Sequence, residues 1–398
     1  MTIGALDRTS ARGPLERCVG DPNAFLREAW GRRARVRTGA EPGGFDDLLT
    51  LGDVDRFLTT TAIRTPFFRL LKAGEQIPES AYTRSGRTGS RDVHGMADPA
   101  RVAALFESGA TLVLQGLHRW SEPVTRFCRD LELELGHPCQ ANAYVTPPGA
   151  QGLALHEDPH DVFVLQAFGR KRWELHAAPE EAERAPIETD VGPGDTIYMP
   201  AGTSHAASTQ DVLSGHLTIG VRVTPWREVL DNVWSRLATD PSAAGSVPAG
   251  WLRDPAGFAH ELGERLAAQA DALRNAIDPR AIAETSVERF LSTRAQLARG
   301  TIERRAGGLR VDDATALRRR PGSVCELRVR GDVLVAMLGD RQLEMPSWLE
   351  PAMRRVAAAD ADALVLGDLV PDVPDSDSRV VLARRLIREG LLAVGDDA

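Results

Sequence analysis

The sequence predicts a protein of mixed α and β structure built around an antiparallel barrel or double-sheet jelly roll. From residue 140 to residue 223, short β-branched and aromatic runs alternate with glycine and proline turns. Helical patterns dominate the chain on both sides of this region. We therefore expect one β-rich domain with an N-terminal helical segment, followed by two further regions.

The β-rich region contains five strand-like runs and four turns. The runs are ANAYVT, DVFVLQAF, RWELH, TIYMP and HLTIGVRV, and the turns are PPGAQG, FGRK, GPGD and PAGTS. We place these strands in a first domain, residues 1–225, which begins with a helical segment between Leu15 and Val36 that is capped by Asp21 or Asn23.

A further helix is predicted ahead of the strands, in the segment GLHRWSEPVTRFCRDLELELG. Its apolar residues recur at spacings of three and four, and Gly136 ends it. These residues are Val124, Phe127, Cys128, Leu131 and Leu135. We expect them to belong to the core.

Helical patterns return after Pro225 and are typical of a helix bundle or a dimerisation segment. We assign residues 226–300 to a helical dimerisation region. Residues 301–398 mix strands and helices, as a small winged-helix-like domain does. The final helix is expected to be capped by Ser376 or Asp377, to end at Gly390 and to precede a strand. Its expected apolar face consists of Val380, Val381, Ile387 and Leu391.

Charge and composition exclude several classes of function. The net charge is −8, and residues 321–398 hold 14 acidic against 9 basic side chains, so nucleic-acid binding is not expected. The four cysteines have no C-x-x-C spacing, which argues against a disulfide framework and a thiolate zinc site. No apolar run approaches the roughly 20 residues of a membrane span, and the N-terminus lacks a secretory signal pattern. We expect a cytoplasmic protein without membrane contacts.

A metal site is suggested by His156 and Asp158, which stand two positions apart and would share one face of a strand. His205 follows 49 residues later (205 − 156 = 49), in the turn of GDTIYMPAGTSHAAS. Two imidazoles and one carboxylate form the facial triad of non-haem Fe(II) oxygenases, which leaves three iron positions open. A bidentate keto acid and O2 could fill these positions.

A plain structural explanation of the same residues stays open on spacing alone. His156 could cap a turn, Asp158 could begin a turn before Pro159, and His205 could be a hydrogen-bonded loop residue. His160 is a further ligand candidate, ranked below His156 because Pro159 interrupts the strand.

The stretch NAYVTPPGAQGLALHEDPHDVFVLQAFGRKRW resembles the signature of the JmjC-type cupin proteins called ribosomal oxygenases. The resemblance extends to the later GD..Y.P.G..H and HLTI segments and to the order of cupin, helical and winged-helix regions. It implies a double-stranded β-helix (JmjC) domain, an enzyme that hydroxylates a protein side chain, and a homodimer.

The resemblance also implies roles for single residues. His156, Asp158 and His205 would bind Fe(II), and Lys171 would pair with the far carboxylate of the cosubstrate 2-oxoglutarate. Lys171 also needs an anionic partner on physical grounds if its ammonium projects into the barrel. Asn142, Tyr144 and Thr218 would also contact the cosubstrate. Trp173 is expected to be core packing.

The chain departs from the family where the substrate would bind. The segment ASTQDVLSGHLTIG replaces the usual H-S-x-H-L-T run, so Ser214 and Gly215 do not align. The polar, glycine-rich region from Phe68 to Asp98 occupies the place where a substrate-facing insertion could lie.

The leading hypothesis is an Fe(II)-, 2-oxoglutarate- and O2-dependent oxygenase that hydroxylates a ribosomal protein on histidine or arginine. One alternative is a hydroxylase of a peptide natural-product precursor. A second is a catalytically silent cupin that serves as a dimeric binding scaffold. Histone demethylation is a third reading, which the ribosomal-oxygenase pattern disfavours.

Overall fold

The computed structural model describes most of the chain in two compact units, Leu6–Val223 and the chain from Thr224 onward. The described residues are 12–39, 41, 43–150, 154–176, 186–237, 246–276, 278–295, 297, 302, 310–320, 322–359 and 364–395. The end of the predicted PPGAQG turn and the predicted boundary at residues 300 and 301 lie outside them.

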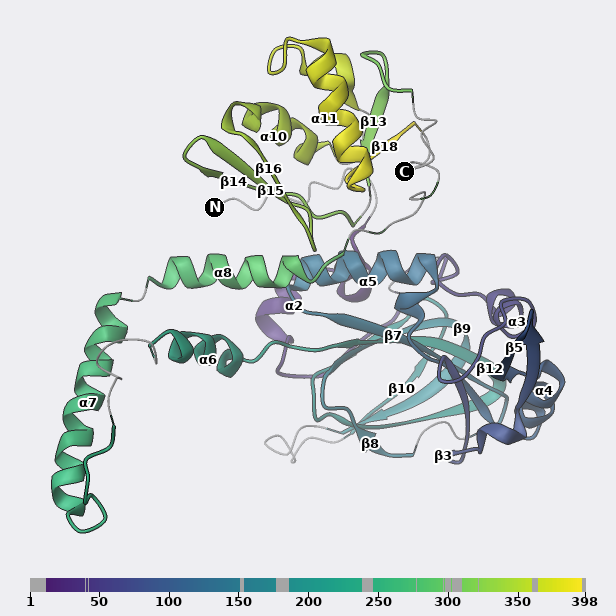
Figure 1. The fold of residues 1–398 in the computed structure, drawn as a ribbon. Helices are drawn as coiled ribbons and strands as arrows, with labels where there is room; N and C mark the ends of the chain where they lie inside the picture. The colour runs from purple at the N-terminus through teal and green to yellow at the C-terminus, as the bar shows by residue number, and fades with distance from the viewer. Residues whose placement is uncertain are drawn as a thin grey trace. The chain divides into compact units, whose positions relative to one another are not determined.

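The first unit is built on a ten-stranded sheet in which all recorded pairings are antiparallel (Figure 1). The strand order is β1-β11-β9-β12-β7-β6-β2-β3, with β10 (Ile187–Val191) paired to β9 and β8 (His156–Glu157) paired to β12. The central strands are β7 (Cys139–Thr146), β9 (Asp161–Leu175), β11 (Thr196–Met199) and β12 (Ser204–Val221). The strand-rich region predicted between residues 140 and 223 is present, and β1, β2, β3 and β6 from earlier in the chain extend its sheet.

Two long bent strands replace several of the short strands that the sequence predicts. β9 runs without a break through the predicted turn FGRK, so that prediction was wrong. The chain bends at Gly169, whose φ of 66° favours glycine, and a Cβ there would collide with the carbonyl of Leu213. β12 likewise has a register shift between Thr209 and Ser214. This is the segment where the sequence departs from the pattern of the family that it resembles.

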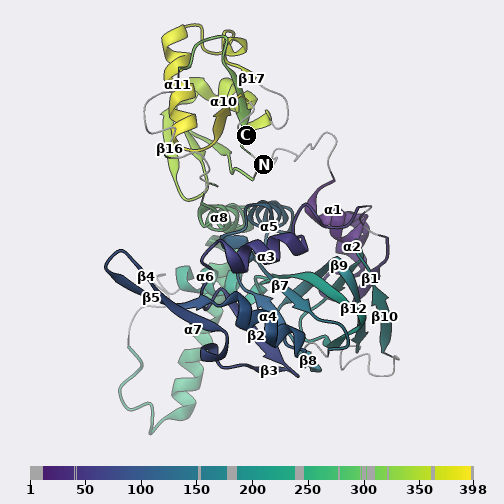
Figure 2. The ribbon, with the colours of Figure 1, turned by 90° about the vertical axis from the view of Figure 1, so that its right-hand side faces the viewer.

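Helices cover part of this sheet, as Figures 1 and 2 show. The N-terminal segment forms α1 (Pro14–Val19) and α2 (Pro22–Glu28), and Asp21 caps α2 by accepting a hydrogen bond from the backbone N–H of Ala24. The predicted helix ahead of the strands is α5 (Glu122–Leu135), which ends at Gly136 in the left-handed conformation. The prediction for α5 is confirmed, and its predicted face is buried except for half-buried Leu135. The N-terminal prediction is confirmed only as far as Glu28, because Val36 belongs to a strand, β1 (Arg35–Arg37).

The segment between α2 and α5 holds elements that the sequence did not reveal. They are β1 (Arg35–Arg37), α3 (Leu51–Thr59), β2 (Phe68–Lys72), β3 (Glu75–Gln76), η1 (Glu79–Ala81), β4 (Thr83–Thr88), β5 (Arg91–Ala97), α4 (Pro99–Glu107), β6 (Thr111–Leu114) and η2 (Leu117–Arg119). The polar region from Phe68 to Asp98 is therefore ordered, and β4 and β5 form an exposed hairpin of their own (Figure 2).

The second unit begins with three helices, α6 (Trp226–Leu237), α7 (Pro255–Ala276) and α8 (Pro279–Ser292). Large apolar side chains stand exposed along them. On α6 the exposed fractions of Trp226, Leu230 and Trp234 are 80%, 50% and 53%, at a spacing of four residues that places them on one face.

The rest of the second unit has its own apolar core and two three-stranded sheets. One sheet has the order β17 (Leu364–Val365), β13 (Ala316–Arg319), β18 (Leu392–Val394). The other is the meander β14 (Glu326–Arg330), β15 (Val333–Met337), β16 (Gln342–Pro346). The accompanying helices are η5 (Ser347–Leu349), α10 (Glu350–Ala358), η6 (Leu366–Leu369) and α11 (Ser376–Arg388).

The final helix corrects two sequence predictions. Its N-cap is Asp375, which accepts a hydrogen bond from the backbone N–H of Ser378 at 2.8 Å, rather than Ser376 or Asp377. Val381 is 66% exposed, because the helical period buries Leu382 and Leu386 instead. The strand predicted after Gly390 is present as β18.

No helix among the described residues is both long and apolar enough to cross a membrane.

Candidate metal centre and pocket

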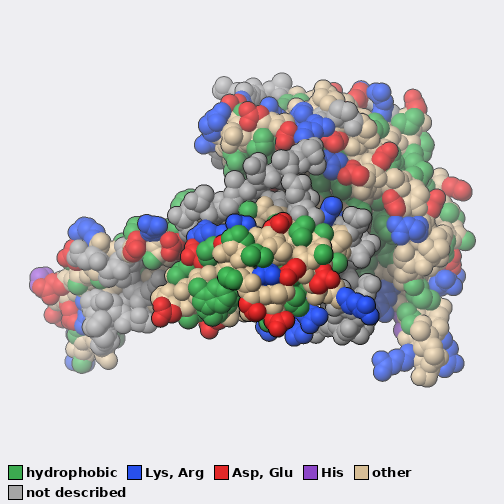
Figure 3. Space-filling model, turned by 90° about the horizontal axis from the view of Figure 1, so that it is seen from above, with side chains coloured by type: hydrophobic (Ala, Val, Ile, Leu, Met, Phe, Trp, Pro, Cys, Tyr) green, Lys and Arg blue, Asp and Glu red, His purple; other side chains and the backbone are tan. Residues whose placement is uncertain are grey.

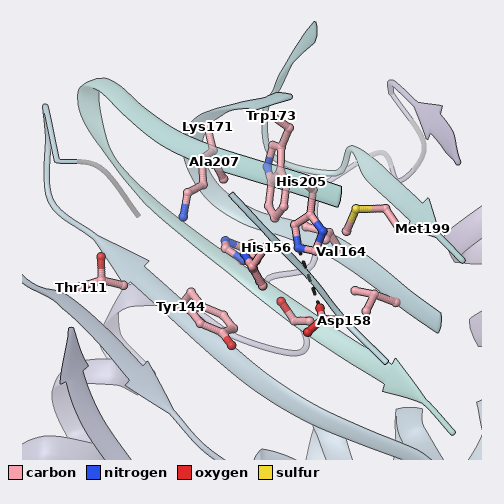
Figure 4. A pocket seen from close by; sticks show the side chains of 13 residues that line it. Thr111, Tyr144, His156, Asp158, Val164, Lys171, Trp173, Met199, His205 and Ala207 are labelled. Atoms are coloured by element: carbon pink, nitrogen blue, oxygen red, sulfur yellow. Dashed lines mark ion pairs between the residues drawn. The ribbon is translucent and has the colours of Figure 1, made fainter. Parts of the chain in front are cut away.

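Three side chains with metal-ligating atoms meet inside the barrel of the first unit (Figure 4). One ligand atom from each of His156, Asp158 and His205 lies within 4.8 Å of the others, and Asp158 Oδ2 is 3.8 Å from His205 Nε2. This is the only such group of three among the residues that the structure describes. The sequence predicted this cluster, and the structure brings its three members together.

The local structure at the cluster differs from the prediction in two ways. The strand holding His156, β8 (His156–Glu157), is only two residues long, so Asp158 follows its end. His205 lies in the second residue of β12, paired with His156, and not in a turn. This pairing sets the two imidazole centroids 4.3 Å apart.

Backbone carbonyls fix both imidazoles in the tautomer that a metal requires. The Nδ1 atom of His156 is 2.8 Å from the carbonyl oxygen of Ala154, and that of His205 is 2.9 Å from the carbonyl oxygen of Thr203. Since each Nδ1 then donates its proton, each Nε2 keeps its lone pair free for a cation. Burial also lowers the pKa of His205, which favours its neutral, ligating form.

Lys171 places a cation deep in the same pocket. Its side chain is 3% exposed, and burial lowers its pKa to about 7. The hydroxyl of Thr146 accepts a hydrogen bond from its ammonium at 3.3 Å, and no carboxylate among the described residues is recorded as its partner. A buried ammonium without an acid is unfavourable, so this end of the pocket fits an anionic ligand.

The three other predicted cosubstrate residues are placed differently. Tyr144 and Thr218 line the pocket, from β7 and β12. Burial raises the pKa of Tyr144, although Arg69 and Asn142 act in the opposite direction on its hydroxyl. Asn142 is not among the lining residues and instead accepts a hydrogen bond from the backbone N–H of Gly116 at 3.0 Å. Its cosubstrate contact stays a prediction.

Sequence reasoning missed several residues of the pocket, which encloses about 440 Å³ including its open mouth. The additional lining residues are Thr111, Val162, Val164, Trp173, Met199, Ala207 and His216. Trp173, expected to be core packing, also faces this pocket (Figure 4). An available signal was strand alternation, because His216 lies two positions from Thr218 and Trp173 two positions from Lys171.

His160 and Asp161 have other roles. His160 Nε2 lies 3.1 Å from the amide nitrogen of Gln140, and His160 is absent from the metal cluster. Asp161 is buried and accepts hydrogen bonds from the hydroxyl of Tyr198 and the backbone N–H of Ala201. The three-residue cluster therefore includes His156, the candidate that the sequence ranked first, and does not include His160.

Comparisons with known proteins agree with this arrangement. Residues 118–229 match the JmjC domain family. Over 230 residues the chain is 29% identical to ribosomal oxygenase 1 of Rattus norvegicus, covering 53% of this chain and 37% of that protein. Over 150 residues it is 33% identical to the bifunctional lysine-specific demethylase and histidyl-hydroxylase NO66 of Branchiostoma floridae, covering 36% and 24%. The chain thus spans about a third of the length of the first of these relatives.

A solved structure matches nearly the whole fold. It is the ribosomal oxygenase YcfD of Escherichia coli, in complex with cobalt and 2-oxoglutarate. The two share 20% sequence identity and a TM-score of 0.54 over 95% of this chain and 99% of that chain. The chain therefore carries a JmjC domain, and its resemblance to the ribosomal oxygenases is confirmed.

Proposed function

We propose that the protein is an Fe(II)- and 2-oxoglutarate-dependent oxygenase that hydroxylates a histidine or arginine side chain of a ribosomal protein. One observation carries the proposal: a two-histidine, one-carboxylate cluster and a buried lysine without an acid partner among the described residues face one pocket. The two histidines and the carboxylate are suitable ligands for Fe(II), and the lysine can pair with the far carboxylate of a keto diacid.

The pocket residues divide the work of the reaction. His156, Asp158 and His205 would hold Fe(II), and Lys171 with Thr146 would anchor 2-oxoglutarate. Iron supplies the O2-activating chemistry, in which 2-oxoglutarate and O2 give succinate, CO2 and one oxygen atom inserted into a substrate C–H bond. Apolar walls, including Val164 and Met199, exclude water from the site.

A protein substrate is supported by the names of the relatives. Those names include ribosomal oxygenase and histidyl-hydroxylase, which place the chemistry of those proteins on protein side chains. On the face drawn in Figure 3, acidic and basic side chains are interspersed, so this face gives no support for a nucleic-acid substrate.

Mass spectrometry of ribosomal proteins tests the proposal. Protein loaded with Fe(II) and 2-oxoglutarate under anaerobic conditions is mixed with extracted ribosomal proteins, and O2 is then admitted. We expect one added oxygen on a histidine or arginine, absent with the His156→Ala variant. Succinate formation without a modified ribosomal protein would move the target to another class, such as a peptide natural-product precursor. Absence of succinate would favour the silent scaffold.

The helices α6 to α8 are assigned to homodimerisation. The single apolar face of Trp226, Leu230 and Trp234 is too exposed for an isolated helix in water, and a second copy of the chain would cover it. The resemblance to the ribosomal oxygenases supports the same role for this region.

Leu230→Asp combined with Trp234→Asp is expected to turn a dimer into a monomer. Each substitution removes about 1.5–3 kcal/mol of apolar burial, so together they weaken association about a hundredfold or more. Analytical ultracentrifugation at micromolar concentration measures the change, with Ser235→Asp on the same exposed helix as the matched control. A monomeric wild-type protein would contradict the assignment.

The remainder of the second unit is proposed to be a winged-helix-like domain that contributes protein contacts. Its meander β14–β15–β16 and helices α10 and α11 suit such a domain. The cytoplasm is the proposed location, in keeping with four free cysteines.

A further inference from the structure

Two buried nitrogen atoms near Lys171 have no hydrogen-bond partner in the structure. They are Nδ1 of His216 and Nε1 of Trp173, whose side chains are 3% and 4% exposed. Both residues line the pocket that holds the metal cluster and Lys171. Buried polar groups are nearly always paired, so two unpaired ones in one pocket require an explanation.

The positions of the two rings are set by packing. The imidazole of His216 stacks on the Tyr144 ring with 5.2 Å between the ring centroids, and it lies in a T-shaped arrangement with the Trp173 indole at a centroid distance of 5.3 Å. Lys171 Nζ lies 6.0 Å from the centre of the Trp173 ring. These contacts gather an ammonium, an indole N–H and an imidazole at one side of the pocket.

The strands explain why these residues share a face. Lys171 and Trp173 are two positions apart on β9, so their side chains point to the same face of the sheet. His216 and Thr218 have the same spacing on β12, which pairs with β9 and with β7. The register shift between Gly215 and His216 sets the imidazole within this face. Figure 4 shows Lys171 and Trp173 projecting into the same space above His156.

We propose that His216 and Trp173 bind the far carboxylate of 2-oxoglutarate together with Lys171. The inference rests on the proposed function for the identity of the ligand. A carboxylate has about four lone-pair positions, and one lysine with one threonine hydroxyl beside it leaves room for two more donors. Trp173 can only donate, and the neutral imidazole of His216 donates from one nitrogen. The site would thereby recognise a dicarboxylate by several directional bonds and not by charge alone.

The test compares two keto acids of equal chain length. 2-Oxoglutarate carries the far carboxylate, whereas 2-oxopentanoate lacks it, and both present the same keto-acid group to the metal. Anaerobic calorimetry with Co(II)-loaded full-length protein measures both dissociation constants without turnover. The variants are His216→Phe and Trp173→Phe, which keep an aromatic ring and remove the N–H donor, and His216→Gln, which restores a donor.

We expect His216→Phe and Trp173→Phe each to weaken 2-oxoglutarate binding about tenfold or more, because each removes a hydrogen bond to a charged group. Binding of 2-oxopentanoate should change by less than about twofold. His216→Gln should recover part of the loss. His94→Phe, on the exposed hairpin, is the matched control and should bind like the wild type. Co(II) affinity and melting temperature report whether each variant is folded.

Three outcomes overturn the inference. Unchanged 2-oxoglutarate binding in both Phe variants, with normal wild-type binding, removes the inference and leaves the proposed function standing. An equal loss for both keto acids shows that the two rings only shape the pocket. Failure of the Co(II)-loaded wild type to bind 2-oxoglutarate at all removes the proposed function and this inference with it.

Discussion

Asp158→Ala is expected to lower succinate formation by at least about a thousandfold, because removing one of three protein ligands weakens iron binding and unbalances the charge of the site. Asp158 is the only carboxylate in the cluster, and the two histidines that complete the cluster cannot replace its negative charge. Succinate is measured after O2 is admitted to protein, Fe(II) and 2-oxoglutarate. A parallel Fe(II) titration separates lost metal binding from lost chemistry.

Glu157→Ala is the matched control for this variant. Glu157 is exposed and lies between His156 and Asp158, yet it is not part of the cluster. We expect near wild-type succinate formation from Glu157→Ala. An equal loss of succinate formation in both variants would show that the local structure of this segment is required, and not the Asp158 ligand itself. An active Asp158→Ala variant would contradict the assignment of Asp158 as a metal ligand.

Lys171→Met is expected to weaken 2-oxoglutarate binding about a hundredfold and, at the same time, to raise the melting temperature of the ligand-free protein. Apart from the metal ligands, Lys171 is the only Lys, Arg, Asp or Glu among the described residues that line the pocket. Methionine at this position therefore removes a charge-assisted hydrogen bond to the cosubstrate. The unliganded fold gains about 1 kcal/mol or more, because methionine removes a buried charge that lacks an acid.

Arg170→Met provides the control, since Arg170 is the exposed neighbour of Lys171 on the same strand. It should change neither the affinity nor the melting temperature appreciably. Calorimetry and thermal melting measure the two effects. A Lys171→Met variant that binds 2-oxoglutarate normally would show that the far carboxylate lies elsewhere.

The same lysine makes cosubstrate binding depend on pH. Burial lowers the pKa of Lys171 to about 7 in the free protein, so the ammonium is fully present only below that pH. A bound carboxylate stabilises the ammonium form. Above the pKa of the free protein, Lys171 must therefore gain a proton when 2-oxoglutarate binds, which costs free energy. Affinity should fall as the pH rises through about 7, and this dependence should disappear in Lys171→Met.

The metal site could be predicted from sequence because its information is local. His156 and Asp158 are two residues apart, and His205 follows a turn-rich segment that closes the barrel. The role of Lys171 came instead from the family resemblance, because Lys171 stands in the segment FGRK, which looked like a turn and left a solvated cation equally open. The continuity of β9 through that segment buries it.

The rest depended on pairings between distant strands. His216 meets Trp173 only because β12 pairs with β9 and shifts register after Gly215, and no pattern within either strand gives that shift. FGRK looked like a turn because glycine and charged residues are typical of turns, yet pairing on both sides kept β9 continuous. Asp375 replaced the expected cap because its carboxylate reaches the N–H of Ser378.

One anaerobic experiment tests the central claim most directly. Protein is loaded with one equivalent of Fe(II) and of 2-oxoglutarate, O2 is admitted, and succinate is counted per iron. The account predicts close to one succinate per iron in the wild type, almost none in Asp158→Ala, and wild-type yield in Glu157→Ala. Iron that binds without forming succinate, or succinate that forms equally in Asp158→Ala, would contradict it.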